Sequence, residues 1–196
     1  MAKGPTYRVA FRRRREGRTD YNLRKRLVSS RKPRLVVRKS LKHLSAQLVE
    51  ARVEGDRVLA SATTIELKEF GWKGGTGNLP AAYLVGFLLG KRALSKGFET
   101  AVLDLNGYPI TKGSRLFAAL KGALDAGMQI PHSEEILPTD ERIKGEHIAK
   151  YAELLQRENP AKYQSQFSKY ISVGLPPESI VQHFETVKEN ISKKVK

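Results

Sequence analysis

Apolar and polar residues alternate along three neighbouring segments in the first half of the chain, as they do in half-buried β-strands. The alternation is clearest in the second segment, where Leu44, Ala46 and Leu48 share one face and more polar side chains share the other. Glu54-Gly55-Asp56 separates the second segment from the third and is typical of a hairpin turn. The predicted strands are residues 34–40, 43–53 and 57–66. We therefore expect a three-stranded antiparallel meander.

The pattern then changes to the spacing of helices. After a glycine-rich loop at residues 71–78, a largely apolar segment with Pro80 in its first turn predicts a buried helix that ends before Gly97. A stripe of apolar residues predicts a second helix over residues 114–126, with Gly127 as its stop.

Between these helices, residues 98–105 are expected to form a buried strand that ends in Asp104 and Asn106. The predicted elements follow one another as β-β-β-α-β-α, which indicates an α/β core with a mixed sheet. A basic N-terminal arm precedes this core and a helical extension follows it. The three parts are residues 1–33, 34–130 and 131–196.

The two flanking parts differ in character. Residues 1–33 contain too few apolar side chains for a core, so we expect this arm to become ordered on its partner. Within the arm, Thr19 or Asp20 is suited to cap a short helix that runs through Ser29. The C-terminal part is predicted to hold a connector, a helix over residues 146–157 and two further short helical segments, punctuated by Pro131, Pro138, Pro160, Pro176 and Pro177. Whether this extension packs on the core stays open.

Positive charge is concentrated near the N-terminus. The first 42 residues contain 16 Lys and Arg and two acidic residues, whereas the remaining 154 contain 20 basic and 18 acidic residues. A surplus this localised is the electrostatic footprint of a polyphosphate partner, so the charge pattern favours binding to nucleic acid, and to RNA in particular. Tyr7, Phe11 and Tyr21 are interleaved with the arginines and add rings on which unpaired bases stack.

Composition excludes several other classes of protein. The chain has no cysteine, which excludes disulfides, thiolate zinc sites and a cysteine nucleophile. The basic N-terminus lacks the apolar run of a secretory signal, and the most apolar stretch, residues 79–90, is too short for a bilayer span. We expect a soluble, intracellular protein with no membrane partner.

Two loops leave their interpretation open. The glycine-rich loop is either a plain turn or a set of backbone N–H groups that bind an RNA phosphate. It is not a Walker loop, because Lys73 precedes the glycines, and Trp72 is expected to be packed rather than stacked on a base. The turn at residues 40–43 is either merely exposed or a contact with RNA backbone.

Residues suited to catalysis are sparse. Asp56, Glu66 and Asp104 are the carboxylates from which a two-metal nuclease site would be built, but their spacing shows no convergence, and Asp104 is expected to cap a turn. The four histidines are dispersed and form no metal-ligand pair, so we expect no metal, no cofactor and no catalytic residue. Two rival functions remain for testing: a magnesium-dependent RNA-processing enzyme and a DNA-compacting protein with a basic tail.

Several motifs occur together in an order that resembles one protein family. The motifs are FRRRREGRTDY at residues 11–21, RKPRLVVRKS at 31–40, GWKGGTGN at 71–78, AAYL at 81–84, LLGKR at 88–92, GSRLFAALKGALDAG at 113–127 and IPHSEE at 130–135. On these residues the chain resembles the archaeal form of the large-subunit ribosomal protein that binds 5S rRNA, the L-eighteen family, called L-five in eukaryotes. The resemblance covers about residues 7–147.

The resemblance implies a structural constituent of the large subunit of the cytoplasmic ribosome, with no enzymatic activity. It implies that the protein binds 5S rRNA and helps anchor it to the large-subunit rRNA at the central protuberance, beside neighbouring ribosomal proteins. The contact candidates carried over in the arm and first strand are Arg12, Arg13, Arg14, Arg15, Arg18, Tyr21, Arg24, Lys25, Arg31, Arg34, Arg38, Ser40, Lys42 and His43. Further candidates are Lys73, Gly74, Thr76, Lys112 and Arg115. The chain departs from the family at Leu41, where relatives often have a small polar residue.

Overall fold

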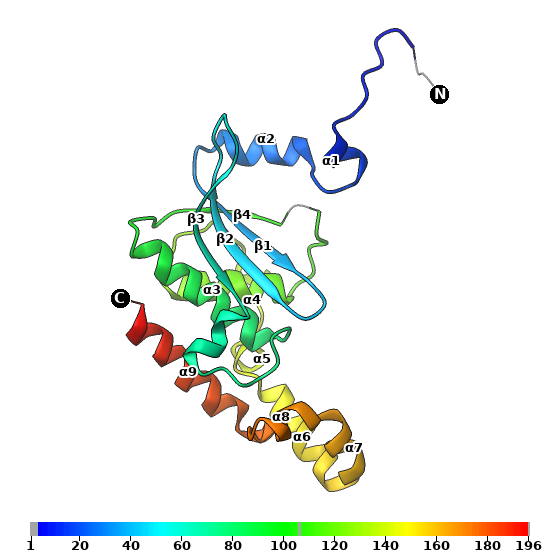
Figure 1. Ribbon diagram of the computed structural model, residues 1–196, viewed down its shortest axis with the longest axis vertical. Coiled ribbons are helices and arrows are strands. Elements are labelled where there is room, and N and C mark those ends of the chain that lie inside the picture. The colour runs from blue at the N-terminus through cyan, green and yellow to red at the C-terminus, as the bar shows by residue number, and fades with distance from the viewer. Residues whose placement is uncertain (1–3, 106, 196) are drawn as a thin grey trace.

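In the computed structural model, which describes residues 4–105 and 107–195, the chain forms an elongated molecule with an α/β core at its centre (Figure 1). The N-terminal arm lies at one end of the long axis, and a group of C-terminal helices lies at the other. Asn106, predicted to end a strand, lies outside the described residues.

A four-stranded mixed sheet forms the centre of the core. Its strands are β1 (Arg34–Lys39), β2 (Leu44–Glu50), β3 (Arg57–Thr63) and β4 (Val102–Asp104). The strand order is β3-β2-β1-β4; the first three strands pair antiparallel, and β4 pairs parallel to β1. The predicted meander is confirmed, and Leu44, Ala46 and Leu48 are buried as their alternation indicated. The predicted α/β class with a mixed sheet is also confirmed.

The last strand is much shorter than the predicted one at residues 98–105, because only three residues pair with β1. The residues just before β4 bond to a different segment. The backbone N–H of Ala101 donates to the carbonyl oxygen of Gln129 at 3.1 Å, and Thr100 forms an isolated bridge with the same residue. The N–H of Val102 points toward the β1 side and donates to Pro33, whereas that of Ala101 points to the opposite side. β4 begins late because its parallel pairing starts where β1 starts, with Arg34 opposite Val102.

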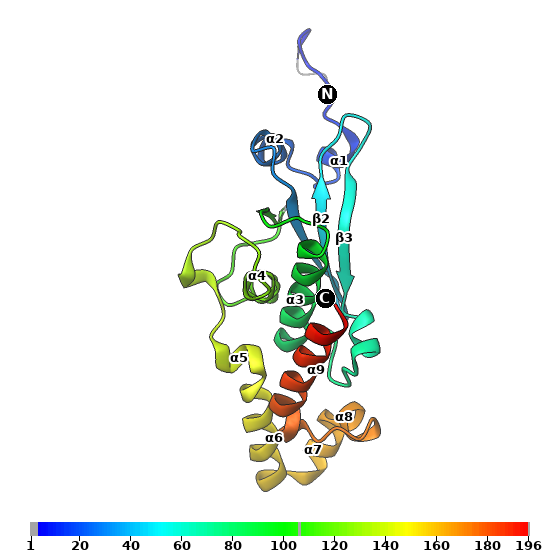
Figure 2. The same ribbon diagram turned by 90° about the vertical axis from the view of Figure 1, so that its left-hand side faces the viewer.

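Two long helices cover one face of the sheet, and the other face is open toward the arm (Figures 1 and 2). They are α3 (Leu79–Leu94) and α4 (Arg115–Asp125), as the apolar pattern predicted. A short 3-10 helix, η1 (Glu66–Phe70), lies between β3 and the glycine-rich loop. A Cβ atom at Gly86 or Gly122 would overlap backbone atoms of the other long helix. Glycine at these two positions therefore permits the close packing of α3 on α4.

The arm contains two helices, α1 (Arg12–Arg15) and α2 (Tyr21–Ser29), neither of which has a buried residue. The carboxylate of Asp20 accepts hydrogen bonds from two backbone N–H groups in the first turn of α2, at 2.9 and 3.1 Å. The predicted arm helix is thus confirmed, with Asp20 rather than Thr19 as its cap.

The C-terminal part contains more helices than predicted. Its elements are η2 (Glu134–Ile136), α5 (Asp140–Lys144), α6 (Glu146–Glu158), α7 (Pro160–Gln166), α8 (Ser168–Ser172), η3 (Pro177–Ser179) and α9 (Ile180–Lys194). The predicted helix at residues 146–157 and the breaks at the prolines are confirmed. The prediction of only two short segments after it is wrong, because α9 alone has 15 residues.

The final helix joins the extension to the core. Ile180, Phe184, Val187 and Ile191 recur at helical spacing along one side of α9 and are buried in the main hydrophobic cluster. Figure 2 shows α9 lying across the lower part of the core beside α3. The extension therefore packs on the core through an apolar stripe. No helix among the described residues is long and apolar enough to cross a membrane.

Candidate nucleic-acid interface

The arm helix α2 lies across the end of the sheet at which β1 begins (Figure 1). A groove of about 480 Å³ lies between the arm and the open face of the sheet. Side chains of the arm, β1, β2 and β3 line this groove. The lining includes four arginines and three valines: Arg13, Arg24, Arg34, Arg38, Val36, Val49 and Val58. The fold thus brings arginines of the arm and of the first strand to one groove, which also contains valine side chains of the sheet.

An ion-pair chain of Arg24, Asp56, Arg34 and Asp104 connects the arm to the sheet. The guanidinium of Arg24 donates two hydrogen bonds to the carboxylate of Asp56, at 2.8 and 2.7 Å. Asp56 also accepts a hydrogen bond from Arg34 at 2.7 Å. Arg34 in turn donates to Asp104 at 2.8 Å. Bidentate pairing of this kind fixes orientation as well as distance. These ion pairs therefore set the position of α2 relative to the sheet.

The pKa of Asp56 is lowered by this arrangement. The hydrogen bond from Arg24 is the largest cause, and Arg34 lowers the pKa further, whereas partial burial of the carboxyl acts in the opposite direction. The same contact raises the pKa of Arg24. Both groups of the arm contact are therefore held in their charged forms.

Arg34 lies inside the ion-pair chain rather than on the surface. The residue is only 4% exposed, and its guanidinium lies between two carboxylates that already neutralise its charge. A buried, doubly paired arginine has neither access nor spare charge for a phosphate. We therefore correct the sequence-based assignment: Arg34 supports the fold and is removed from the RNA-contact candidates.

The carboxylates that were considered for catalysis are bound to arginines. Asp104 is buried in β4 and paired with Arg34, so the prediction that it caps a turn is wrong. Asp56 does approach Asp104 through that shared arginine, but Glu66 instead accepts from Arg92. Across residues 4–105 and 107–195, no three His, Cys, Asp or Glu side chains lie close enough to hold a metal ion.

The remaining cations of the arm are displayed to solvent. Phe11 packs against Tyr21 with ring centroids 5.2 Å apart, which connects α1 to α2. Arg12 and Arg18 lie near Glu16, at 3.4 and 3.1 Å. The exposed candidates are Arg12, Arg13, Arg14, Arg15, Arg18, Lys25 and Arg31, while Tyr21 and Arg24 are half-buried. Consecutive side chains of a helix point in different directions. The arginines of α1 therefore project on different sides of the helix, which suits an RNA backbone that curves around it.

A second set of candidates meets at the far end of β1. In the turn at residues 40–43, the hydroxyl of Ser40 accepts from the backbone N–H of His43 at 3.0 Å. The hydroxyl of Thr76 in the glycine-rich loop donates to the carbonyl oxygen of Lys42 at 2.8 Å. Arg115, at the start of α4, donates to the carbonyl oxygen of Gly77 at 2.7 Å. Three segments distant in sequence thus form one surface, here named the turn-loop surface: residues 40–43, residues 71–78 and Arg115. Lys42 is exposed on it and His43 is half-buried.

Tyr108 joins this surface although the sequence analysis did not select it. Arg38 and Lys39 lie over its ring, 5.9 and 5.4 Å from the centroid. Its hydroxyl donates to the carbonyl oxygen of Lys39 at 3.1 Å. The last candidate, Lys112, is exposed and paired with Glu135 at 2.9 Å. An aromatic residue in a polar loop after a strand was the only sequence signal for Tyr108.

Side chains of the C-terminal extension are hydrogen-bonded to the backbone of the glycine-rich loop. The backbone N–H of Lys73 donates to Nε2 of His183, and that of Gly75 donates to the hydroxyl of Tyr170, both at 3.0 Å. These two N–H groups are consequently not available for a phosphate, which corrects the phosphate-cradle interpretation for both positions. Trp72 is buried and stacks on His183 with ring centroids 5.2 Å apart, so its predicted packing is confirmed.

Asp56, Tyr170 and His183 were missed as organisers of the interface. Each acts on a partner far away in sequence: 32 residues separate Arg24 from Asp56, and 110 separate Lys73 from His183. No local motif signals such contacts, because only the fold brings the partners together.

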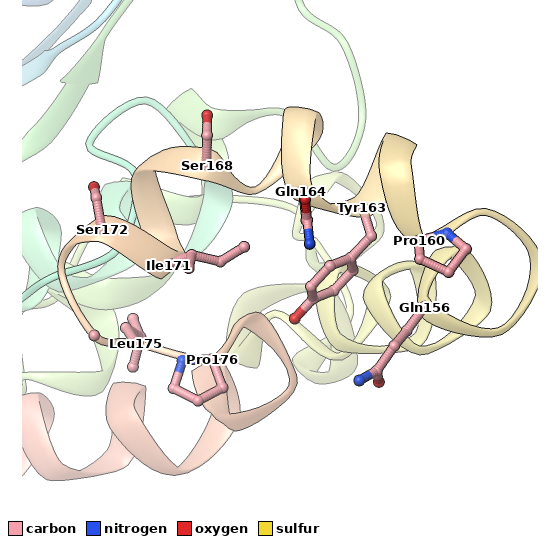
Figure 3. A pocket seen from close by; sticks show the side chains of 10 residues that line it. Gln156, Pro160, Tyr163, Gln164, Ser168, Ile171, Ser172, Leu175 and Pro176 are labelled. Carbon is pink, nitrogen blue, oxygen red and sulfur yellow. The ribbon is translucent and has the colours of Figure 1, made fainter.

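A pocket of about 780 Å³ lies at the opposite end of the molecule, among α6, α7 and α8 (Figure 3). Tyr163, Ile171 and Leu175 are among its lining side chains. The residues that line it, all in the described part of the chain, include no Lys, Arg, Asp or Glu. Without cations the pocket is unsuited to phosphates. The candidate interface therefore does not include it and consists of the arm, the open sheet face and the turn-loop surface.

The chain is similar to ribosomal proteins over its whole length. The family described as "Ribosomal large subunit proteins 60S L5, and 50S L18" matches residues 5–103. The large ribosomal subunit protein uL18 of Aeropyrum pernix is 58% identical over 197 residues, covering 100% of this chain and 92% of the relative. The protein of the same name from Caldivirga maquilingensis is 54% identical over 195 residues, covering 99% of this chain and 94% of the relative.

Proposed function

The chain belongs to the uL18 family of large-subunit ribosomal proteins, and we propose that it binds 5S rRNA and helps anchor this RNA to the large-subunit rRNA at the central protuberance. As a family member it is a structural constituent of the large ribosomal subunit and not an enzyme. The identity of the bound RNA and its place in the subunit are the proposed part.

The observation that carries the proposal is the course of the cations along the molecule. β1 begins beneath α2 and runs to the turn at residues 40–43 (Figure 1), so basic side chains lie near both ends of this strand: the exposed arginines of the arm at one end, and half-buried Arg38 and Lys39 with exposed Lys42 at the other. Cations at both places suit an RNA backbone that spans the face, and the Phe11–Tyr21 pair adds aromatic surface at the arm. This arrangement supports binding to a folded RNA over a broad surface.

The three parts of the chain receive different roles in this proposal. Residues 1–33 contact RNA phosphates, residues 34–130 display the open sheet face and the turn-loop surface, and residues 131–196 buttress that core. If about ten phosphates are neutralised, the slope of log affinity against log salt is expected to be about −7 to −9. An affinity nearly independent of salt would contradict the electrostatic account.

The proposal is tested by competition binding at about 0.2 M salt, where nonspecific contacts are weak. Labelled 5S rRNA is competed with unlabelled 5S rRNA, tRNA and duplex DNA. A preference for 5S rRNA of about a hundredfold or more supports the proposed function. Equal competition by all three would show that the protein binds polyanions without preference for 5S rRNA. This outcome would favour the DNA-compacting alternative.

A further inference from the structure

The glycine-rich loop at residues 71–78 lies between two parts of the molecule. On one side it bonds to the turn at residues 40–43 and to Arg115. On the other side it is bonded by α8 and α9 of the extension. The loop is therefore the physical connection between the C-terminal helices and a surface that we propose contacts RNA.

Side chains of the extension donate or accept further hydrogen bonds that restrain this glycine-rich loop. Four of its eight residues are glycine, so the unrestrained loop would sample many conformations. Tyr170 of α8 accepts from the Gly75 N–H at 3.0 Å and lies 3.4 Å from the side-chain amide of Asn78. His183 of α9 accepts from the Lys73 N–H at 3.0 Å while its ring stacks on Trp72.

The segment just before the loop is fastened by the same helix. Asn190 donates to the carbonyl oxygen of Phe70 at 3.1 Å, and Lys194 donates to that of Glu69 at 2.9 Å. Both acceptors lie in η1, whose last residue precedes the loop. Contacts from α9 therefore begin before the loop and continue into it.

We infer that the C-terminal extension is a positioning element for RNA binding: Tyr170 and His183 fix the backbone of residues 73–75, and the loop in turn fixes the turn at residues 40–43. This inference rests on the proposed function. Lys73 is exposed, while the N–H groups of Lys73 and Gly75 are bonded to the extension, so the loop contributes its side chains and its shape rather than these amides. A pre-ordered loop avoids the entropy cost of ordering it on RNA.

The test uses two substitutions in the full chain. Tyr170→Phe removes only the hydroxyl that binds Gly75, and His183→Ala removes the acceptor for Lys73 together with the ring that stacks on Trp72. The matched control is Tyr163→Phe, because Tyr163 lies in the same extension and its hydroxyl donates to Glu178, at 2.9 Å, rather than to the loop. Amide hydrogen exchange at Lys73 and Gly75, thermal stability and affinity for 5S rRNA are measured for all variants.

The expected result is faster exchange at Gly75 in Tyr170→Phe and at Lys73 in His183→Ala, with affinity for 5S rRNA weakened about two- to tenfold in each. Tyr163→Phe is expected to leave both readouts unchanged. Faster exchange without loss of affinity, or equal losses in the control, would overturn the inference. Failure of the wild type to prefer 5S rRNA would instead count against the proposed function, and the exchange data would still report on positioning of the loop.

Discussion

The N-terminal arm and the C-terminal extension differ in almost every physical respect. Residues 1–33 contain 12 Lys and Arg against 2 acidic residues, whereas residues 131–196 contain 10 of each. The helices of the arm have no buried residue, while α9 alone buries Ile180, Phe184, Val187 and Ile191. The arm therefore carries a large positive charge and buries no residue in its helices. The extension adds buried apolar side chains to the core and has no net charge.

If the proposed function holds, this difference means that the arm supplies affinity for RNA and the C-terminal extension supplies a fixed geometry, from opposite ends of the chain. Long-range attraction to phosphates needs exposed cations, and these repel one another in a compact structure. A fixed recognition loop needs buried contacts and neutral hydrogen-bond acceptors, which a run of arginines does not provide. The ion-pair chain ties the arm to the core through Asp56, whose side chain is partly exposed, and continues to the buried Arg34.

The largest effect is expected from removing the charge of α1. Replacing Arg12, Arg13, Arg14 and Arg15 with alanine should weaken binding to 5S rRNA at least about 100-fold and reduce the salt slope by about 3, because four phosphate contacts are lost. The melting temperature should stay unchanged, since all four side chains are exposed. Fluorescence anisotropy over a salt series and calorimetry provide the two measurements.

The matched control removes four exposed cations from the extension: Lys150, Arg157, Lys162 and Lys169. The comparison between the two regions predicts at most a severalfold loss of affinity for this variant. An equal loss in both variants would show that only net charge matters and would remove the distinction between the regions.

A smaller effect, with an informative sign, is expected from Asp56→Asn. The substitution removes one negative charge, so a purely electrostatic account predicts tighter binding to RNA. Loss of the bidentate contact with Arg24 should instead release α2 and weaken binding to 5S rRNA about tenfold. Because Arg34 loses the charge of one partner but keeps Asp104, unfolding should also become easier by about 1–2 kcal/mol. Tighter binding by the variant would show that the ion-pair chain does not position the arm.

The smallest effect concerns pH and belongs to the extension. Burial, and then the charge of Lys73, lower the pKa of His183 below its ordinary value of 6.5. The unfolded chain therefore takes up a proton at a higher pH than the folded chain, so stability is complete above pH 6.5 and is lost as the pH falls below it. Between pH 7.5 and 5 the melting temperature should drop by a few degrees.

Replacing His183 with glutamine, which keeps an acceptor but does not titrate, should make this pH dependence weaker. A remainder is expected because the pKa of His147 is also lowered, by burial and by the charge of Arg142. Identical pH profiles of wild type and variant would indicate that His183 is not bonded to the loop in its neutral form.

Much of the fold followed from local patterns in the sequence. The alternation around Leu44, Ala46 and Leu48 predicted the meander, and the helix cap was narrowed to Thr19 or Asp20, because both features depend on near neighbours. The extent of β4 could not be predicted from its apolar run, since its start is set by the point where its partner β1 begins, with Arg34 opposite Val102. The apolar stripe of α9 was present in the sequence, but its partner surface on the core was not visible there.

By itself, the sequence determined the family, the order of the core elements and the region from which the cations come, because composition and short-range periodicity are properties of the chain alone. Only the tertiary structure decided which of these residues face a partner. Arg34 is not an RNA-contact candidate in the structure, because it is paired with both Asp56 and Asp104. The backbone N–H groups of Lys73 and Gly75 are hydrogen-bonded to His183 and Tyr170. A side chain's access and free charge depend on the groups that the fold places around it, and here those groups lie 22 to 110 residues away.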